Sequence, residues 1–307
     1  MAYKVNVLMS TYNGAHYVVE QIESLKRQKN VDVSLYIRDD GSKDDTCACI
    51  RQKQFKNVYI EEGNNVGYRK SFMRLLLSVP TDHDYYAFCD QDDVWKEDKL
   101  ERACSYLSKQ EGPALYCAKP QYVNDQLQLI EGNGGMLDTL PLGEATLEDV
   151  IATGLFGLGC TMVWNKALQN IIVSYQGLAG EEIAHDNFMT VLAGAVGHVY
   201  LDGEKVFLYR QHATNASGDK QSKSVGTKIE NLKGAKKATN FNYNLRMLVY
   251  THYSKFIPEN RRKLMKVSLD AKGHIVSRLR YLFVGFPHRL VRYQKIKFIV
   301  MTLTGNL

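Results

Sequence analysis

YYAFCDQDDVW, residues 85–95, decides the fold of this chain. An apolar, aromatic run with strand character is followed within four positions by the carboxylates of Asp90, Asp92 and Asp93. A strand buried in a parallel sheet has no place for such charge in its interior. The carboxylates are therefore expected where the strand ends and solvent or a ligand begins. An acidic helix start is the alternative explanation, and we expect Asp93 and Trp95 to begin the next helix.

Three further segments repeat this design. Residues 5–14, 33–42 and 57–67 each start with an apolar run and end in small polar or acidic residues, and a helical apolar spacing follows each of them. Strands that alternate with helices predict right-handed crossovers and an α/β fold with a mostly parallel sheet and flanking helices. Ligands bind at the carboxyl ends of strands in such sheets. The polar ends should therefore converge on one site.

The length and composition fit a globular protein. A chain of 307 residues can bury a substantial core in one or two domains. No uncharged apolar run approaches the roughly 20 residues of a membrane span, and the longest, residues 150–164, predicts buried sheet and loop. The chain enters a strand almost at once, so we expect no secretory signal. The six scattered cysteines are expected to be reduced in a cytoplasmic protein.

The net charge of +6 conceals an asymmetry between two parts of the chain. Residues 221–307 hold 18 Lys and Arg against three acids, whereas the rest of the chain holds 21 basic and 30 acidic residues. A stretch rich in Ser, Gly, Asp and Lys, residues 215–223, predicts the boundary between them. The apolar spacing of the basic part predicts helices over residues 229–256, 259–269 and 274–303.

The last of these segments mixes apolar side chains with Arg and Lys. Basic amphipathic helices are typical of membrane surfaces, because Lys and Arg meet anionic lipid while the apolar side enters the interface. We therefore expect a peripheral protein on the inner face of the cell membrane. A helical subdomain with a solvated basic face is the alternative. Nucleic acid is not expected, because no helix-turn-helix, zinc or RRM signature accompanies the charge.

Six motifs carry a family resemblance through their order and spacing. They are STYNGAHYVVEQIESL (10–25), IRDDGSKDDT (37–46), GNNVGYRKSF (63–72), FCDQDDVW (88–95), AHDNFMTVLAGAVGHVYLD (184–202) and YRQH (209–212). Together they resemble the family 2 inverting glycosyltransferases of the GT-A fold, and most of all the bacterial rhamnosyltransferase branch. The resemblance covers about two-thirds of the chain. One departure follows the HD pair, His185 and Asp186, where Asn187 and Phe188 replace an aromatic that often stands there.

The resemblance implies a domain plan and an activity. A GT-A (Rossmann-like) catalytic domain would span residues 1–218, with a nucleotide-sugar half over about 1–112 and an acceptor half over about 113–218. Residues 219–307 would form a basic helical C-terminal region that associates with the membrane. The implied reaction is a metal-dependent single displacement that moves L-rhamnose from dTDP-β-L-rhamnose to a lipid-linked saccharide in cell-wall or surface polysaccharide synthesis. A UDP-sugar is the alternative donor.

The same resemblance assigns the nucleotide-sugar pocket. Thr11 and Tyr12 would line it, and Asp39 would accept a hydrogen bond from the imide N–H of the base. Asn65 and Gly67 would shape the loop beneath the sugar or base. From the residues alone, the alternative role for Asp39 is a turn or helix cap, which Asp40, Ser42 and Asp44 could supply instead, and the alternative for the loop is a plain turn.

The metal site is expected at the acidic strand end. Asp92 is the first choice for direct ligation of Mg²⁺ or Mn²⁺, and Asp90 would contact the pentose or reach the metal through water. Arg210 and His212 follow the apolar residues 206–209 and would hold the diphosphate or complete the metal shell. A structural role is the alternative for His212.

Asp186 is the expected general base, since it lies near the start of a helical pattern and matches the HD pair. His185 would orient this carboxylate or contact the acceptor. Glu181 and Glu182 are the alternative bases. The acceptor pocket is also expected to include a loop-strand junction formed by Gly159, Cys160 and Thr161.

Two other classes of function fit less well. A hydrolase or nucleotidyltransferase would need an activated water or a triphosphate cradle, and the sequence has neither a P-loop nor a nucleophile elbow. A non-catalytic membrane scaffold with a degenerate enzyme fold would not need Asp39, Asp90, Asp92 and Asp186 together.

Overall fold

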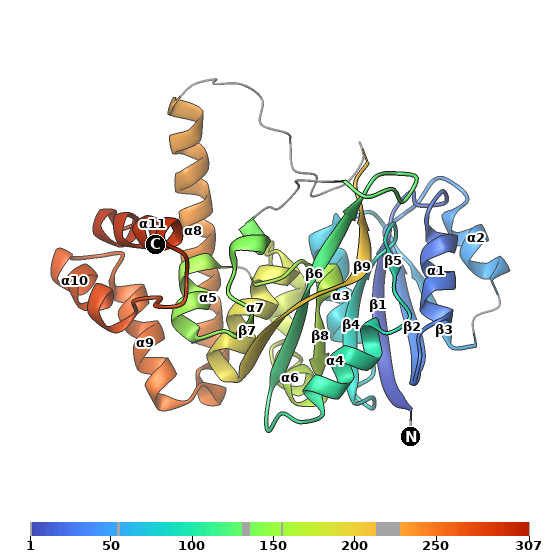
Figure 1. The fold of residues 1–307 in the computed structure, drawn as a ribbon, viewed down its shortest axis with the longest axis horizontal. Coiled ribbons are helices and arrows are strands. Elements are labelled where there is room, and N and C mark those ends of the chain that lie inside the picture. Colours follow the sequence, from blue (N-terminus) through green and yellow to red (C-terminus); the bar gives the residue numbers. More distant parts are fainter. Residues whose placement is uncertain (1, 54–55, 131–135, 155, 213–227, 307) are drawn as a thin grey trace.

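The computed structural model describes residues 2–53, 56–130, 136–154, 156–212 and 228–306 (Figure 1). Over these residues the chain forms a nine-stranded sheet flanked by helices. The strands are β1 Tyr3–Thr11, β2 Val31–Asp39, β3 Val58–Glu62, β4 Tyr85–Asp90, β5 Val94–Trp95, β6 Ala114–Val123, β7 Gly143–Glu144, β8 Val163–Asn165 and β9 His198–Arg210. The α-helices are α1 Val18–Lys26, α2 Thr46–Gln52, α3 Tyr68–Ser78, α4 Lys99–Leu107, α5 Leu147–Thr153, α6 Lys166–Ile172, α7 His185–Val196, α8 Lys228–Tyr253, α9 Glu259–Asp270, α10 Ile275–Val284 and α11 Arg292–Thr304, and the 3-10 helices are η1 Met136–Thr139, η2 Gly159–Thr161, η3 Gln176–Gly180 and η4 Ser254–Phe256.

The strand order brings the polar strand ends to one edge of the sheet. Strands run β3-β2-β1-β4-β8-β6-β9-β5, and β7 pairs with β9. The first four are mutually parallel, β8 is antiparallel to both neighbours, and β6 and β9 are parallel. Ser10 is in register with Asp90, and Thr11 with Asp39. The predicted α/β class and the predicted convergence of strand ends are therefore confirmed.

Each face of the sheet has its own core. Successive strand residues point to opposite faces, so Val5, Val7 and Met9 of β1 join one core with α1 and α4, whereas Leu8 joins the other with α3, α6 and α7. All four side chains are fully buried. The two apolar layers hold the strands from both faces of the sheet, and thereby fix the position of the polar strand ends.

The segment after the acidic residues differs from our expectation. Asp93 and Trp95 do not begin a helix: Val94 and Trp95 form β5, which pairs with β9, and α4 begins at Lys99. Trp95 is 2% exposed. Burying this large aromatic side chain beside β9 outweighs a helix start at the acidic turn, because burial of such a side chain stabilises by about 2 kcal/mol or more.

Two other predicted segments are also wrong in part. Residues 150–164 are not only sheet and loop, because α5 extends to Thr153. A capping box between Thr146 and Asp149 starts this helix, and Gly154 ends it in the left-handed conformation. The segment 274–303 is not one helix but two, α10 and α11. Pro287 lies between them and lacks the amide that a continuous helix would need.

The C-terminal helices pack against the sheet's helical layer, at the end of the molecule where α8 to α11 gather (Figure 1). Leu245, Val249 and Tyr253 of α8 are buried in the same core as Phe188 of α7. Among the described residues, no helix combines the length and the apolar character needed to cross a bilayer. The predicted boundary at residues 215–223 lies outside the described residues.

Candidate active site

The carboxylate of Asp39 links the end of β1 to the loop that follows β2 through hydrogen bonds. The hydroxyl of Thr11 donates to Asp39 Oδ1 at 2.8 Å, and Ser42 donates its amide to Oδ2 at 2.7 Å and its hydroxyl to Oδ1 at 2.6 Å. Asp39 is 2% exposed. Its carboxylate is therefore held in one orientation at the sheet edge by three short hydrogen bonds.

A buried ion pair anchors the loop before α3. Arg38 Nη1 lies 2.6 Å from Asp40 Oδ1, and both side chains are almost fully buried. The two oxygens of Asp40 accept the amides of Val66 and Gly67 at 2.9 and 2.8 Å. Gly67 has a φ of 82°, which favours glycine. Asn65 and Gly67 thus lie on a loop whose position is set by a charge at the end of β2.

Gln91 connects the acidic turn to the loop after β1. Its side-chain amide accepts from Tyr12 N at 2.9 Å and donates to Tyr12 O at 3.1 Å. The loop passes so close that a Cβ on Gly14 would lie 2.2 Å from Gln91 Oε1. Tyr12 remains 44% exposed, so its ring is available to a ligand while its backbone is fixed.

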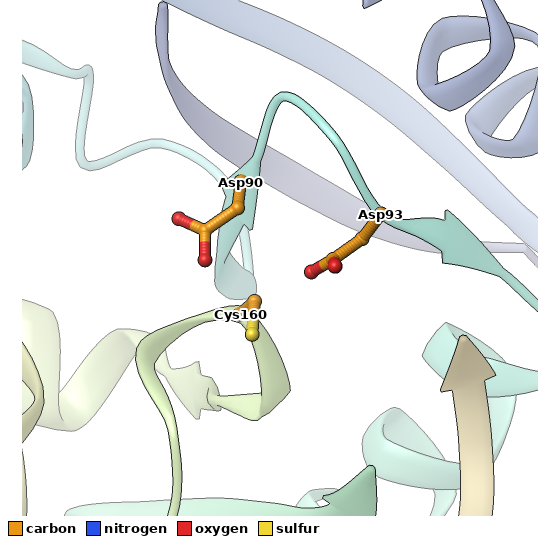
Figure 2. A group of neighbouring side chains, drawn as sticks. All are labelled: Asp90, Asp93 and Cys160. Atoms are coloured by element: carbon orange, nitrogen blue, oxygen red, sulfur yellow. The ribbon is translucent and has the colours of Figure 1, made fainter. Parts of the chain in front are cut away.

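The acidic turn between β4 and β5 contains a compact group of ligating atoms. Figure 2 shows Asp90 at the end of β4, Asp93 across the turn, and Cys160 of η2 beside them. One carboxylate oxygen from each Asp and the thiol of Cys160 lie within 4.8 Å of one another. Asp93 is 1% exposed, and its Oδ2 has no hydrogen-bond partner among the described residues.

Burial and the negative charges that lie close together in this turn raise the pKa values of the Asp90 and Asp93 carboxyl groups. Burial, together with the nearby charge of Asp92, raises the pKa of Asp90 to about 7. The same two causes raise the pKa of Asp93 well above its ordinary value. Lys99 lies behind the turn, with its Nζ 3.1 Å from the centroid of the Trp95 ring, and burial lowers its pKa to about 8. A cation already lies beside the buried pair Asp93 and Cys160, which disfavours a metal ion there.

Asp92 faces His212 on the more open side of the turn. His212 Nε2 lies 2.8 Å from Asp92 Oδ2, and the two side chains are 10% and 16% exposed. The imidazole stacks on the ring of Tyr17 at a centroid separation of 4.7 Å. Tyr17 donates its hydroxyl to Asp125 at 2.7 Å. The carboxylates of Asp90 and Asp92 offer the oxygen ligands that Mg²⁺ and Mn²⁺ prefer, and His212 lies against Asp92.

Arg210 fastens the end of β9 to the acidic turn. Its Nε donates to the carbonyl oxygen of Asp92 at 2.9 Å, and its backbone amide donates to Asp93 Oδ1 at 3.2 Å. Further guanidinium donors meet Glu20 and the carbonyl of Asp125. The side chain is 4% exposed. The structure thus surrounds Arg210 with acceptors from the protein, and a contact with the diphosphate stays a prediction.

Asp186 lies in the first turn of α7, as the sequence predicted. Its Oδ1 accepts the amide of Asn187 at 2.8 Å, and its negative charge contributes to the raised pKa of Asp90. Asn187 donates its side-chain amide to the carbonyl of Gly154 at 2.7 Å, which holds the start of the helix in place. A carboxylate from α7 therefore lies near the acidic turn.

His185 is buried between two aromatic rings. Its imidazole lies 4.3 Å from the ring of Phe72 and 4.7 Å from that of Phe88, measured between centroids. Neither ring nitrogen has a hydrogen-bond partner among the described residues, and burial lowers the pKa of His185. Gly159 makes room for it, since a Cβ there would lie 2.0 Å from His185 Nε2. The imidazole is therefore neutral at pH 7.

The alternative bases are placed differently. Glu182 is 80% exposed and pairs with Lys70 at 2.8 Å, and this hydrogen bond lowers its pKa. Glu181 follows η3 and is partly exposed. Because its pKa is lowered, Glu182 accepts a proton less readily near neutral pH than a general base should.

Comparison with known proteins identifies the family. A sequence model described as glycosyl transferase family 2 matches residues 6–164. The chain belongs to glycosyl transferase family 2. One relative of this family 2 glycosyltransferase is the dTDP-rhamnosyl transferase RfbG of Shigella flexneri, which is 29% identical over 68% of this chain and 73% of its own length.

Solved structures confirm the GT-A glycosyltransferase fold. S. aureus TarS, solved with UDP-GlcNAc, superposes with a TM-score of 0.60 at 16% identity, over 98% of this chain and 81% of its own. A mannosyltransferase of Pyrobaculum calidifontis, solved with GDP-Man and Mn²⁺, gives 0.51 at 15% identity, over 100% and 86%.

The structure of this family 2 glycosyltransferase brings most of the predicted site residues to one edge. Asp39, the acidic turn, His212 and Asp186 all lie there, together with Cys160 and Thr161 of η2. Sequence reasoning missed the residues that fix this edge, because several of their partners are distant in sequence. Gln91 stands within the quoted motif and offered the clearest signal. The others are Glu20, Arg38, Asp40, Lys99 and Asp125.

Proposed function

We propose that this chain is an inverting rhamnosyltransferase that uses dTDP-β-L-rhamnose and a lipid-linked saccharide acceptor. The observation that carries the proposal is the meeting of Asp39, the acidic turn and Asp186 at one edge of a family 2 sheet. The relative named a dTDP-rhamnosyl transferase supports the choice of donor. Cell-wall or surface polysaccharide synthesis is the process that such a product would serve.

The donor would lie along the carboxyl ends of β1, β2 and β4. Thr11, Tyr12 and Asp39 would hold the nucleoside, with Asp39 accepting from the imide of the base. The loop with Asn65 and Gly67 would close the pocket beneath it. Because hydrogen bonds already hold Asp39 and Asp40 in place, donor binding would need little ordering of these side chains, which would reduce the entropic cost of binding.

Asp92, Asp90 and His212 would hold Mg²⁺ or Mn²⁺, which neutralises charge on the leaving diphosphate when it is bound. Arg210 would add positive charge on this side and keep the turn in place. A metal ion and a proton compete for the same carboxylates, and the raised pKa of Asp90 makes this competition strongest below about pH 7.

Asp186 would accept the proton of the acceptor hydroxyl while that oxygen attacks the anomeric carbon. The C1–O bond to the diphosphate breaks on the opposite face, so the configuration inverts. The amide of Asn187 would orient this carboxylate, and His185 would pack beneath the acceptor, with Cys160 and Thr161 lining the same pocket. Proximity and electrostatic stabilisation would supply most of the rate.

We further propose that the chain works on the inner face of the cell membrane, held peripherally by the C-terminal region. This placement would bring the lipid-linked acceptor to a site that receives its nucleotide sugar from the cytosol. It is supported by the 18 basic residues against three acids in residues 221–307.

A panel of nucleotide sugars tests the proposed reaction. The protein is incubated with Mg²⁺ or Mn²⁺, a lipid-linked saccharide, and dTDP-rhamnose, UDP-GlcNAc, UDP-Glc or GDP-Man, and release of nucleoside diphosphate is measured. Acceptor-dependent release from dTDP-rhamnose alone is expected, with inversion at C1 in the product. Faster release from a UDP-sugar would identify that nucleotide sugar as the donor in place of dTDP-rhamnose. No release from any donor would support the alternative of a non-catalytic scaffold.

A further inference from the structure

Exposed apolar side chains are concentrated in the last two helices. Sixteen large apolar side chains are exposed among the described residues, and ten of them belong to the segment 275–303. Phe283, Val276 and Tyr293 are 86%, 73% and 70% exposed. Single exposed apolar residues are ordinary on a protein surface, but such a concentration marks a surface that contacts something else.

On α11 these side chains occupy one face. Gln294, Phe298 and Thr302, spaced four residues apart, are buried against the protein. By helical geometry, the opposite face carries the exposed apolar residues. These are Tyr293, Ile296, Val300 and Leu303.

On α10 the arrangement is the same. Tyr281 is fully buried and its ring packs against that of Phe298 of α11 at 5.5 Å. Val276, Leu279 and Phe283 lie on the opposite side of α10 and are exposed. We call the exposed apolar residues of the two helices together the α10–α11 surface.

Positive charge accompanies the α10–α11 surface. Arg280, Arg292 and Lys297 are exposed, and residues 271–307 contain no Asp or Glu. On α11, the helical spacing places Arg292 and Lys297 on either side of the apolar row. An apolar row bordered by cations complements an anionic bilayer surface, where the row enters the interface and the cations meet phosphates.

We propose that α10 and α11 lie in the headgroup region of an anionic bilayer, with Phe283 and Ile296 entering the interface. This inference deepens the proposed function, since it names the surface that would bring the site to a lipid-linked acceptor. Only the role of the lipid-linked acceptor rests on that function, whereas binding to the bilayer does not. An anionic bilayer fits better than an apolar protein partner, because a purely apolar partner would leave the bordering cations without counter-charges.

Point substitutions test this surface better than a truncation. Arg278 Nη1 donates to the carbonyl of Leu303 and Nη2 to that of Gly273, both at 3.0 Å, so the two helices are bonded to each other. Tyr281 and Phe298 belong to the protein core. Removal of residues from 278 onward would therefore disturb the fold as well as the surface.

Vesicle sedimentation provides the measurement, with the full chain and vesicles of phosphatidylglycerol and phosphatidylcholine. The double variant Phe283→Ser/Ile296→Ser should weaken binding at least tenfold. Its matched control, Tyr59→Ser/Leu129→Ser, removes two apolar side chains that are 53% and 66% exposed elsewhere, and should bind within twofold of the parent.

A second pair of variants tests the charges. Arg292→Gln/Lys297→Gln should weaken binding about tenfold at low salt and less at high salt, because each cation near an anionic surface is screened within a Debye length. The control Lys4→Gln/Lys109→Gln removes the same charge from exposed positions on β1 and beyond α4, and should have little effect.

Three results would overturn the inference. The first is unchanged vesicle binding by Phe283→Ser/Ile296→Ser, and the second is equal binding of the parent to vesicles without phosphatidylglycerol. The third is a shift from dimer to monomer in Phe283→Ser/Ile296→Ser with vesicle binding unaltered, which would assign the surface to a second copy of the chain. The assay contains no sugar donor. A chain that binds vesicles but transfers no sugar therefore keeps this inference and contradicts the proposed function.

Discussion

Asp186 is held at the start of α7 by the amide of Asn187, and its charge acts on Asp90 in the acidic turn. Asp186→Asn keeps the shape and this hydrogen bond but removes the proton acceptor. We expect turnover to fall by roughly two to four orders of magnitude, with nucleotide-sugar affinity nearly unchanged. Steady-state transfer and donor binding are the measurements.

Glu182→Gln is the matched control for this substitution. Glu182 is 80% exposed and paired with Lys70, so its loss should change turnover less than threefold. Normal turnover by Asp186→Asn, combined with a large loss in Glu181→Gln or Glu182→Gln, would move the role of base to that glutamate.

The acidic turn offers a prediction about the metal. EDTA should abolish transfer, and Mg²⁺ or Mn²⁺ should restore it. Asp92→Asn should weaken donor binding at least tenfold with metal present and much less without it, because the lost charge faces the ion. Calorimetric titration of the nucleotide with and without metal measures this difference. Full transfer in EDTA would contradict a metal role for Asp92.

His185 should make stability depend on pH. Burial lowers its pKa in the folded state, whereas the unfolded imidazole protonates near pH 6.5. As the pH falls through about 6.5, the imidazole binds a proton more readily in the unfolded state, so His185 contributes a decrease in the free energy of unfolding from pH 7.5 to pH 5. The raised pKa values of Asp90 and Asp93 act in the opposite direction over this range. Urea unfolding at both values should therefore show that the change in unfolding free energy from pH 7.5 to pH 5 is less unfavourable in His185→Gln than in the parent. His274→Gln, at an exposed position, should keep the parental slope.

At the scale of single elements, the loop before α3 depends on one buried ion pair. Arg38→Met leaves Asp40 charged, buried and without its partner, and should cost about 3–5 kcal/mol of unfolding free energy. The double variant Arg38→Met/Asp40→Leu should cost less than the sum of its two single variants. Denaturant unfolding of the four proteins measures the coupling.

The control for this pair is an exposed one. Arg51 and Glu62 form an ion pair with side chains 58% and 51% exposed. Arg51→Met should therefore cost less than about 1 kcal/mol. Equal costs for Arg38→Met and Arg51→Met would show that the loop is held by other contacts.

Elements with local signals could be predicted from the sequence. The first four strands each join a continuous apolar run to a polar end, and the parallel sheet follows from their alternation with helices. The two-residue strand β5 could not be predicted, because it exists only through its pairing with β9 more than a hundred residues later. The same limit applies to Arg210, whose acceptors come from three separate parts of the chain.

At the scale of the whole molecule, the change of charge near residue 220 indicated the C-terminal helices but not their packing. Leu245, Val249 and Tyr253 share a core with α7, and Tyr253 donates its hydroxyl to the carbonyl of Ile172 at 3.1 Å. Charge can be read from composition, whereas contacts between distant apolar residues cannot. The sequence therefore predicts helices after residue 220 but not that they pack on the helical layer of the sheet.

This packing predicts the behaviour of a shortened chain. A fragment of residues 1–212 would expose the surface that α8 covers, and each of its three buried side chains contributes about 1.5–3 kcal/mol. We expect the fragment to lose more than about 5 kcal/mol of stability and to bind a hydrophobic dye. Unfolding by urea and dye fluorescence are the measurements. A fragment as stable as the full chain would instead support an independent domain ending near residue 218.

The bonds from Arg210 to the acidic turn also impose an order of assembly on a chain being synthesised. Asp90 leaves the ribosome 120 residues before Arg210, which corresponds to roughly 6–24 seconds at ordinary rates of translation. Throughout that interval β1 to β4 can pair, but the turn lacks the arginine and the imidazole that complete it. Nascent chains should therefore neither capture metal nor consume nucleotide sugar until the last strand of the sheet has emerged.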